Sequence, residues 1–455
     1  MKKTVPYTIA IVLGFGSMLT HAAVEPELAT QLGKTLTIWG AEILGNSDGS
    51  IPAYTKPVDA PANYNPEFPG VRPDPFAQEQ PLFSIDARNV QQYADKLSEG
   101  TREMLSKYAS YRLDIYPTHR NVEYPDYVQQ NTVRNAVSCT AIGQQLQLEN
   151  CYGGLPFPIP QTGTQVMWNH LVRYQAYAWQ GLYRNYFVHG SGLKVLQSEI
   201  KTYLQAPFYR PLRKGPAAPN ELYYMVRTDY TGPPRRAGEK LVLHNSIDMM
   251  QGGQSVWQYL PGMRRVKLSP NLMYDTPNPH TGGSSAMDES QLFHGPLDYY
   301  DFNLLGKREV FIPYNNFRIN DSSLCPVDKK LQRHHLHPDC VRWELHRVWV
   351  VQGTLKRGKR HMAPKRMFYF DEDAPGAGVA DSYDYSGQVS RSAISLSYPM
   401  YEAKGIASDS YTVYDFLTGS YALIGDSADT GGTYISKPRP LRFFSPEAMA
   451  ADSVR

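Results

Sequence analysis

Val341-Arg342-Trp343-Glu344-Leu345-His346 is the stretch of sequence that decides the fold of this chain. Apolar and polar residues alternate through it, which is the side-chain pattern of a β-strand. One face of such a strand packs on a core or a cavity, and the other face meets water. The stretch therefore predicts a sheet whose two faces differ.

Similar patterns on both sides of this stretch predict a wide antiparallel sheet. Tyr outnumbers Phe by 33 to 16, and Gly and Pro, at 35 each, punctuate the chain, which is typical of a sheet with many turns. Gln254–Val266 combines an aromatic strand, a Pro-Gly turn and a second strand, so it predicts a hairpin. The expected strands are 177–189, 221–231, 240–246, 255–260, 264–268, 307–313, 341–355, 365–371, 387–396 and 411–417.

The residues before the sheet follow other patterns. Residues 1–23 place Lys2 and Lys3 before a short apolar run that ends in small residues, which predicts a cleaved export signal. Residues 24–150 are expected to form an N-terminal arm and helical region, and 151–455 the β-rich domain. The helical segments expected across the chain are 26–34, 84–108, 126–137 and 165–173, with short turns at 247–250 and 288–293 over the sheet, and a strand at 111–116.

The cysteines lie in the exported part as two close pairs, Cys139 with Cys151 and Cys325 with Cys340. Export makes them candidates for disulfides. Although four cysteines allow three connectivities, closeness along the chain favours local pairing. The formal net charge of +3 is nearly balanced, so neither nucleic acid nor an acidic polymer is implied as a partner.

Metal binding is not expected. His334, His335, His337 and His346 lie near Cys340, but the first two are adjacent and the cysteine is better used in a disulfide. The Trp168-Asn169-His170 cluster is expected to have a structural role. No cofactor is expected.

Catalysis is not expected either. The chain has no His-Glu-x-x-His motif and no glycine-rich phosphate loop. Asp384 with Ser386, or Ser392 with a distant histidine, leaves a hydrolase as an alternative, because triads are recognised by geometry.

Several blocks of sequence carry a resemblance that covers nearly the whole exported part. They are Gly154–Pro160, Trp168–His170, Asp298–Glu309, Phe311–Asn315 and Asp384–Val389. The chain resembles an exported family of unknown function that is described as outer-membrane lipoprotein-sorting-like and grouped with the periplasmic lipoprotein carriers LolA and LolB.

The resemblance implies an α+β, mainly β fold: a large, incomplete antiparallel β-barrel with covering helices and an apolar cavity for acyl chains. It also implies a location in the periplasm, with an inner-membrane transporter of the RND type and an outer-membrane protein as partners. The function expected is that of a carrier or chaperone for a lipid or other hydrophobic ligand. A non-catalytic scaffold of the transporter is the alternative.

A soluble carrier must offer acyl chains a concave apolar surface, because burying each CH₂ is worth about 0.8 kcal/mol. Side chains that simply fill a packed core would give the same pattern. Arg264 and Arg265 follow the hairpin turn and are candidates for contact with a lipid headgroup or a partner, with a solvated strand end as the simpler interpretation. The candidate cavity residues are Trp257, Tyr259, Val266, Phe302, Phe311, Trp343, Leu345, Trp349, Phe368 and Phe370.

Overall fold

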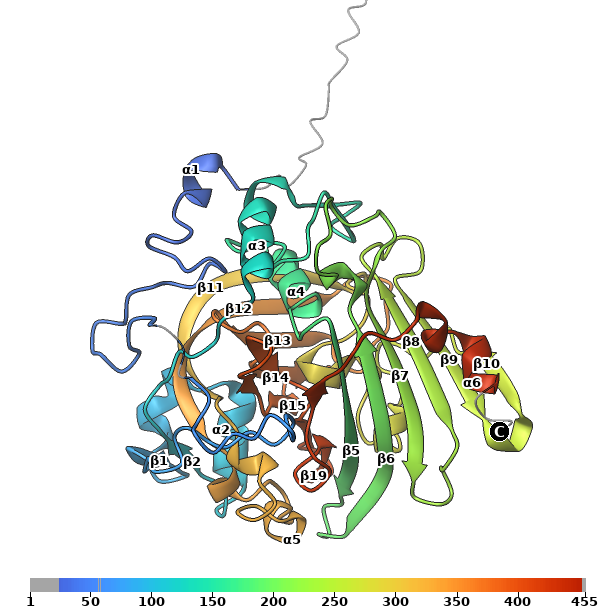
Figure 1. Cartoon of the computed structure of the whole chain (residues 1–455). Coiled ribbons are helices and arrows are strands. Elements are labelled where there is room, and N and C mark those ends of the chain that lie inside the picture. The colour runs from blue at the N-terminus through green and yellow to red at the C-terminus, as the bar shows by residue number, and fades with distance from the viewer. Residues whose placement is uncertain (1–23, 56, 58, 452–455) are drawn as a thin grey trace, which may run out of the picture.

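A sheet of sixteen strands organises the computed structural model of the chain, which describes residues 24–55, 57 and 59–451. The predicted export signal lies outside the described residues. The strand order is β1-β2-β12-β13-β14-β15-β18-β19-β5-β6-β7-β8-β9-β10, with β11 on β12 and β20 on β5 (Figure 1). Its strand pairs are antiparallel apart from the Trp343–Ile115 contact between β12 and β2.

The strands of this sheet differ widely in length. They are β1 Phe83–Ile85, β2 Leu113–Ile115, β5 Ala178–Val188, β6 Lys194–Gln205, β7 Leu222–Gly232, β8 Lys240–Ser246, β9 Gln254–Leu260, β10 Arg265–Leu268, β11 Tyr300–Pro313, β12 Trp343–Leu355, β13 Lys365–Asp371, β14 Gly378–Tyr383, β15 Val389–Ser395, β18 Tyr411–Asp415, β19 Ser420–Asp426 and β20 Tyr434–Ile435. Two small hairpins lie outside it, β3 Thr140–Ile142 with β4 Gln147–Glu149, and β16 Tyr398–Met400 with β17 Gly405–Ala407.

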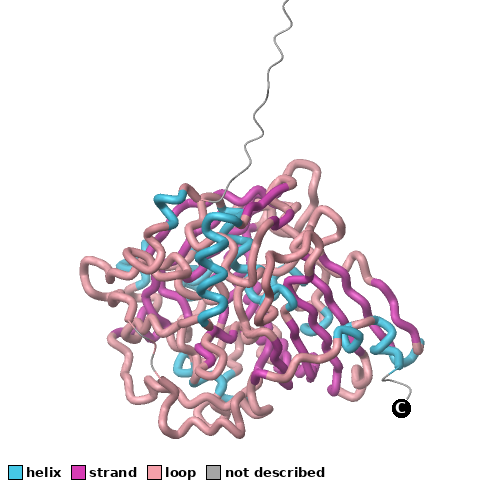
Figure 2. The backbone as a smooth tube through the Cα atoms, turned by 45° about the horizontal axis from the view of Figure 1, so that its top comes forward, coloured by secondary structure: helices cyan, strands magenta, loops and turns pink. Residues whose placement is uncertain are grey.

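The helices are short and lie among long loops (Figure 2). The α-helices are α1 Pro26–Ala29, α2 Glu99–Lys107, α3 Asp126–Ser138, α4 Gly163–Leu171, α5 Val327–Lys330 and α6 Pro446–Ala451. The 3₁₀ turns are η1 Val90–Lys96, η2 Pro207–Tyr209, η3 Pro261–Met263, η4 Pro279–Thr281, η5 Met287–Leu292, η6 Arg318–Asn320, η7 Pro338–Cys340 and η8 Leu441–Phe444. None of the helices described has the length and hydropathy needed to cross a membrane.

The sheet curls but does not close. β10 and β11 are its long edges, and no strand pair between described residues joins them. Helix α4 packs against β11 and β12, α2 against β14 and β15, and α6 against β8, β9 and β10. The predicted mainly β fold, an incomplete antiparallel barrel with covering helices, is therefore confirmed.

Most predicted strands lie close to their predicted bounds, and β8 and β13 match them. The sequence prediction missed β6, β14 and β19, and it made β11 too short at its start. The turn expected at 247–250 is wrong, because Asp248 instead forms a bridge with Gln147. The long helix expected after residue 84 is two elements, η1 and α2, because the chain extends at Leu97 and Ser98 caps a new helix by accepting from the Thr101 amide.

A buried network of charges joins the N-terminal segment to the sheet. The Trp39 indole donates to Asp373 at 3.2 Å, and the Arg120 guanidinium donates to the same carboxylate at 2.7 Å. Beside them, the Lys307 ammonium lies 2.7 Å from Glu372. These contacts join residues on both sides of the predicted boundary between 150 and 151. The division into two regions at this boundary stays a prediction.

Candidate functional site

The inner face of β5 to β8 forms an apolar floor. Cross-strand pairing aligns Trp179 with Leu204, Leu204 with Val226, and Val226 with Leu243. Because side chains opposite one another in a sheet point to the same face, these four form one continuous row. A second row, Thr202, Thr228 and Leu241, lies beside it in the same register.

A segment without regular strands covers this floor. We call residues 276–297 the cover; it contains η4 and η5. Turn η4 contacts β5 and β6, and η5 contacts β15 and β18. Between η4 and η5 the cover contains the run Thr281-Gly282-Gly283-Ser284-Ser285-Ala286, whose side chains are all small.

Floor and cover border a cavity of about 140 Å³ that is partly open to solvent. Its wall is mixed: aliphatic and aromatic side chains come mainly from the strands, and polar ones come from the strands as well as from the cover and the adjoining loops. The apolar members are Trp179, Ile200, Leu204, Val226, Leu241, Leu243, Met287 and Ile424, and the polar or amphipathic ones include Gln175, Tyr183, Asn185, Thr202, Tyr224, Thr228, His280, Ser290, Gln291, His294, Asp409 and Tyr411.

Two tyrosine–histidine pairs fasten the cover to β7. The Tyr224 hydroxyl lies 2.6 Å from Nδ1 of His294, and the Tyr230 hydroxyl lies 2.8 Å from Nδ1 of His280. Burial, helped by Arg173, lowers the pKa of His294 to about 4. Burial, helped by Arg236, lowers the pKa of His280 to about 4 as well. Both rings are therefore neutral at pH 7 and add no charge to the cavity wall.

One end of the cavity is polar. The fully buried guanidinium of Arg173 donates to Gln291 at 2.5 Å and to Ser408 at 3.2 Å, and burial lowers its pKa to about 10. Gln291 and Leu292 both have positive φ, 52° and 77°, which costs non-glycine residues about 1–2 kcal/mol each. The pKa of Asp409 is raised by burial. Backbone strain that delivers an amide oxygen to a buried arginine is typical of a functional site.

Ion pairs fix the η5 half of the cover. Asp288 lies 2.9 Å from the Arg366 guanidinium and 2.8 Å from His361, while Glu289 lies 2.6 Å from Arg391. These side chains are buried or nearly so, and removing one partner of such a pair typically costs about 3–5 kcal/mol. The η5 turn is therefore held firmly against the sheet.

Trp257, Tyr259 and Val266 do not line this cavity. Trp257 pairs with Val242, one residue away from the inward Leu243, and Tyr259 pairs with Val266. All three lie on the opposite face of the sheet, where they pack with Val242 and with Met449 of α6. A shift of one residue along a strand changes the face, so a hydrophobic pattern alone does not tell which face is hollow.

The other seven predicted cavity residues lie in the packed part of the sheet. Phe311 pairs with Leu345, and Trp349 pairs with Phe370, so these share a face. His170 of α4 stacks on Phe370 at 4.3 Å, and Phe293 lies 5.6 Å from Phe368 and 5.9 Å from Phe302. Neighbouring side chains therefore fill this region. Phe302, Phe311, Trp343, Leu345, Phe368 and Phe370 are buried, and Trp349 is partly buried.

Arg264 and Arg265 lie at the turn between β9 and β10, where both are exposed. Contact with a headgroup or partner stays a prediction for them.

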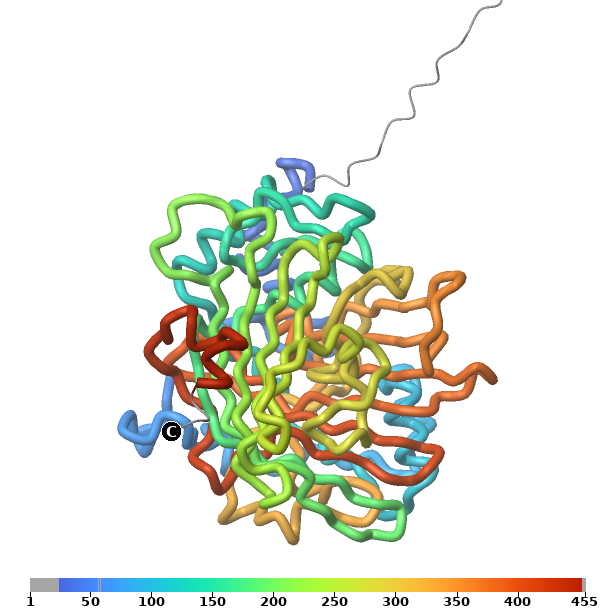
Figure 3. The backbone as a smooth tube through the Cα atoms, turned by 90° about the vertical axis from the view of Figure 1, so that its right-hand side faces the viewer, coloured from blue at the N-terminus to red at the C-terminus, as the bar shows by residue number. Residues whose placement is uncertain are grey.

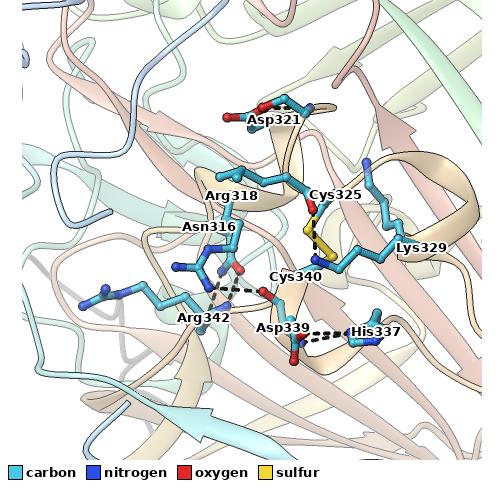
Figure 4. Close-up of a disulfide and its surroundings, with 12 residues drawn as sticks. Asn316, Arg318, Asp321, Cys325, Lys329, His337, Asp339, Cys340 and Arg342 are labelled. Carbon is cyan, nitrogen blue, oxygen red and sulfur yellow. Dashed lines mark hydrogen bonds and ion pairs between the residues drawn. A yellow bond between two sulfur atoms is a disulfide. The ribbon is translucent and has the colours of Figure 1, made fainter. Parts of the chain in front are cut away.

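The cysteines pair locally, Cys139 with Cys151 and Cys325 with Cys340. Figure 4 shows the second bond closing the loop 325–340, which is flanked by two further contacts: the Arg342 amide donates to Asn316, and the Arg318 guanidinium donates to the Asp339 carbonyl. Inside that loop, Lys330 forms a fully buried ion pair with Asp426 of β19 at 2.5 Å. The bond thus secures the loop to the sheet.

The histidines considered for zinc have other partners. His334 contacts the Gly419 carbonyl, His335 contacts Ser110, and His337 lies 3.7 Å from Asp339. His346 lies between Asp371 and Glu344, at 3.0 and 3.2 Å. In the part of the chain that the structure describes, no group of three or more His, Cys, Asp or Glu side chains could hold a metal ion.

The residues considered for hydrolysis have structural contacts. The Ser392 hydroxyl donates to Asp381 at 2.8 Å, and that carboxylate also accepts from the Gly100 amide of α2. Asp384 accepts from the Ser386 and Gln388 amides of its own turn. In the predicted cluster at 168–170, the Trp168 indole donates to the Gln145 carbonyl and Asn169 bonds Phe157, so both hold loops.

Together these features define an open antiparallel sheet whose inner face carries a covered, largely apolar cavity. Residues 84–450 match the family described as Protein of unknown function (DUF1329). The chain belongs to this family, so the family resemblance found in the sequence is confirmed. An uncharacterized protein of Pseudomonas aeruginosa is 34% identical over 458 residues, covering 100% of this chain and 99% of its own length.

Similar solved structures share less sequence. A Vibrio parahaemolyticus domain named for outer membrane lipoprotein sorting has 13% identity and a TM-score of 0.43, covering 63% of this chain and 98% of its own. A DUF1329 family protein from Desulfovibrio piger has 16% identity and a TM-score of 0.40, covering 61% and 93%. A LolA superfamily protein from Nitrosomonas europaea has 9% identity and a TM-score of 0.35, covering 64% and 100%.

Proposed function

We propose that this protein is a carrier or chaperone for a lipid or another hydrophobic ligand in the cell envelope. The observation that carries the proposal is the apolar floor of β5 to β8, which faces a cavity instead of packed side chains. An apolar wall offers water few hydrogen bonds, whereas an apolar group that binds there is transferred out of water, which is favourable. The neutral tyrosine–histidine pairs and the polar end suit a ligand with an apolar body and a small polar group.

The cavity volume limits what the closed form holds. At about 140 Å³ it is close to apolar cavities of about 150 Å³ that bind benzene, and smaller than the roughly 300–1,000 Å³ of most ligand pockets. The closed form therefore has room for one ring or the end of a chain. A complete acyl chain requires that part of the cover move.

We propose that the η4 half of the cover moves and the η5 half stays. Turn η4 is held by hydrogen bonds: the Ser198 hydroxyl donates to the His280 carbonyl at 2.7 Å, and Arg236 donates to the Pro279 carbonyl at 2.5 Å. Such bonds contribute about 0.5–1.5 kcal/mol each, or about 1.5–3 when charged, which is less than the cost of breaking the ion pairs of η5.

Disulfides support a location in the periplasm, because such bonds persist in oxidising compartments. An RND-type transporter and an outer-membrane protein are the proposed partners for loading and release, on the strength of the resemblance in sequence. Since the candidate hydrolytic residues hold turns and loops, we propose that the protein binds its ligand without converting it.

The test is binding of a fluorescent fatty acid by the exported chain with both disulfides formed. Val226→Trp fills the middle of the floor and is expected to weaken binding about tenfold or more, since excluding two CH₂ groups forfeits about 1.6 kcal/mol. Lys201→Trp, which places the same new side chain on the exposed outer side of β6, is the control and should bind normally. Equal affinity in both variants contradicts the assignment of the cavity, and no binding by the natural chain would favour the scaffold alternative.

A further inference from the structure

One end of the sheet carries a row of separate hairpins. The register places the turns of β12–β13, β14–β15, β18–β19 and β5–β6 at the same end, as the successive pairs Lys365–Tyr383, Arg391–Asp415 and Tyr421–Val188 require. We call these turns, residues 356–364, 384–388, 416–419 and 189–193, the hairpin rim. In Figure 3 they project side by side, three in orange to red and the green β5–β6 hairpin below them.

Each hairpin of the rim exposes one large apolar side chain. Met362 is 43% exposed, Tyr385 73%, Leu417 77% and Leu193 61%. Scattered exposed hydrophobic residues need no explanation, but here one occurs on each of four neighbouring turns. The side chains stand on separate tips and form no continuous apolar patch of the kind that a stable protein interface buries at its centre.

The first hairpin is strongly basic. Residues 356–365 include Lys356, Arg357, Lys359, Arg360 and Lys365 and no acidic residue. Lys359 lies 2.9 Å from Asp298 and Lys356 lies 3.9 Å from Asp301. Arg357 and Arg360 are exposed, and neither has an ion pair with a residue that the structure describes.

Acidic groups elsewhere on the rim offset only part of this charge. Asp384 is exposed and keeps its negative charge, which the Ser386 and Gln388 amides of its turn stabilise at 2.9 and 3.0 Å. Asp415, next to the rim, pairs with Arg391 at 2.8 Å. The rim therefore has an excess of positive charge, at its basic hairpin.

We infer that the hairpin rim docks on the surface of an anionic phospholipid bilayer. Basic side chains are attracted to the negative headgroups, and isolated apolar tips insert at the boundary between headgroups and acyl chains. The basic hairpin also contacts the chain just before and just after the cover: the Met362 amide donates to Asp275 at 2.8 Å, and Lys359 lies 2.9 Å from Asp298. Docking through the rim would thus bring the cover next to the lipid.

The test is co-sedimentation of the exported chain with vesicles of equal parts phosphatidylglycerol and phosphatidylcholine, and with vesicles of phosphatidylcholine alone. The natural chain should bind only the anionic vesicles. Arg357→Ala with Arg360→Ala should lower the partition coefficient about 30-fold, at about 1 kcal/mol for each basic residue near an anionic surface. The matched control is Arg210→Ala with Lys214→Ala, two exposed basic residues in the loop between β6 and β7 at the opposite end.

A second readout follows insertion of the tips. In Leu417→Trp the added fluorescence should shift to the blue with anionic vesicles, whereas Leu212→Trp, at a position 95% exposed in the opposite loop, should not change. Equal losses for both charge pairs, or no binding by the natural chain, would overturn the inference, and the second result would leave an acidic protein as the partner of the rim. Vesicle binding without uptake of a fatty acid would keep this inference and end the carrier proposal.

Discussion

The half of the sheet from β11 to β14 and the half from β5 to β8 have the same antiparallel pairing, but the cavity described above lies on the second. In the first, Phe368 lies among Phe293, Phe302 and Phe370, with ring centroids 5.6 to 6.2 Å apart. In the second, Leu204, Val226 and Leu243 face the cover across empty space. The packed half and the hollow half, as we call them, differ in what covers them.

The side chains that lie over each half explain why one is packed and the other is hollow. Over the packed half, α4 and the end of the cover supply rings, such as those of His170 and Phe293. Over the hollow half, the cover residues that line the cavity are His280, Met287, Ser290, Gln291 and His294, most of them polar. Protein interiors normally pack to crystal density, so a hollow left open between a sheet and its cover has the form of a binding site.

The largest expected contrast is in stability. Leu345 and Leu243 are buried to a similar extent, 4% and 6% exposed, in the packed and hollow halves. Leu345→Ala should lower the free energy of unfolding by about 4–5 kcal/mol and Leu243→Ala by only about 2 kcal/mol, because the cost rises with the new volume that neighbours cannot refill. Urea denaturation of both variants measures this. Equal losses would mean that the cavity is filled in solution.

The next contrast concerns a charged histidine in the packed half. Burial opposes protonation of His346, but Asp371 and Glu344 outweigh it and raise its pKa to about 9. A raised pKa stabilises the fold fully below the unfolded value of 6.5 and loses that stabilisation as pH rises through 9. At pH 6 the free energy of unfolding should therefore be higher for the natural chain than for His346→Gln. This difference should shrink by about 3 kcal/mol when the pH is raised above 9. A difference that does not change with pH would contradict the charged state.

The packed half is also the part that sequence reasoning describes best. The alternation at 341–346 and the turns around β8 and β13 fix strands whose patterns are local. β14 was missed because Asp381 and Ser382 interrupt it, and the buried Asp381 is satisfied by the Gly100 amide, far away in sequence. The disulfide pairs followed from closeness along the chain.

The cavity could not be predicted in the same way. β6, which contributes Ile200, Thr202 and Leu204, is hard to recognise because polar Thr202 lies on the inner face and aromatic Tyr203 on the outer face, which breaks the alternation. Aromatic content pointed to the packed half, since rings fill space as readily as they line it. The cover residues that line the hollow, such as Met287 and Gln291, meet β6 and β7 only in the folded chain, so no local sequence pattern marks them.

The smallest expected contrast is the pH response of the hollow half, where the sign is opposite to that of His346. Burial lowers the pKa of His294 to about 4, so the unfolded chain, with a pKa near 6.5, binds the extra proton first as pH falls. The stabilisation is complete above pH 6.5 and is lost towards pH 4. Relative to His294→Gln, the natural chain should lose about 2 kcal/mol of unfolding free energy between pH 7 and pH 4.5. If this difference in unfolding free energy does not change with pH while that for His346→Gln does, the Tyr224–His294 hydrogen bond is not formed in solution. The cover would then already be detached from β7 on this side of the cavity.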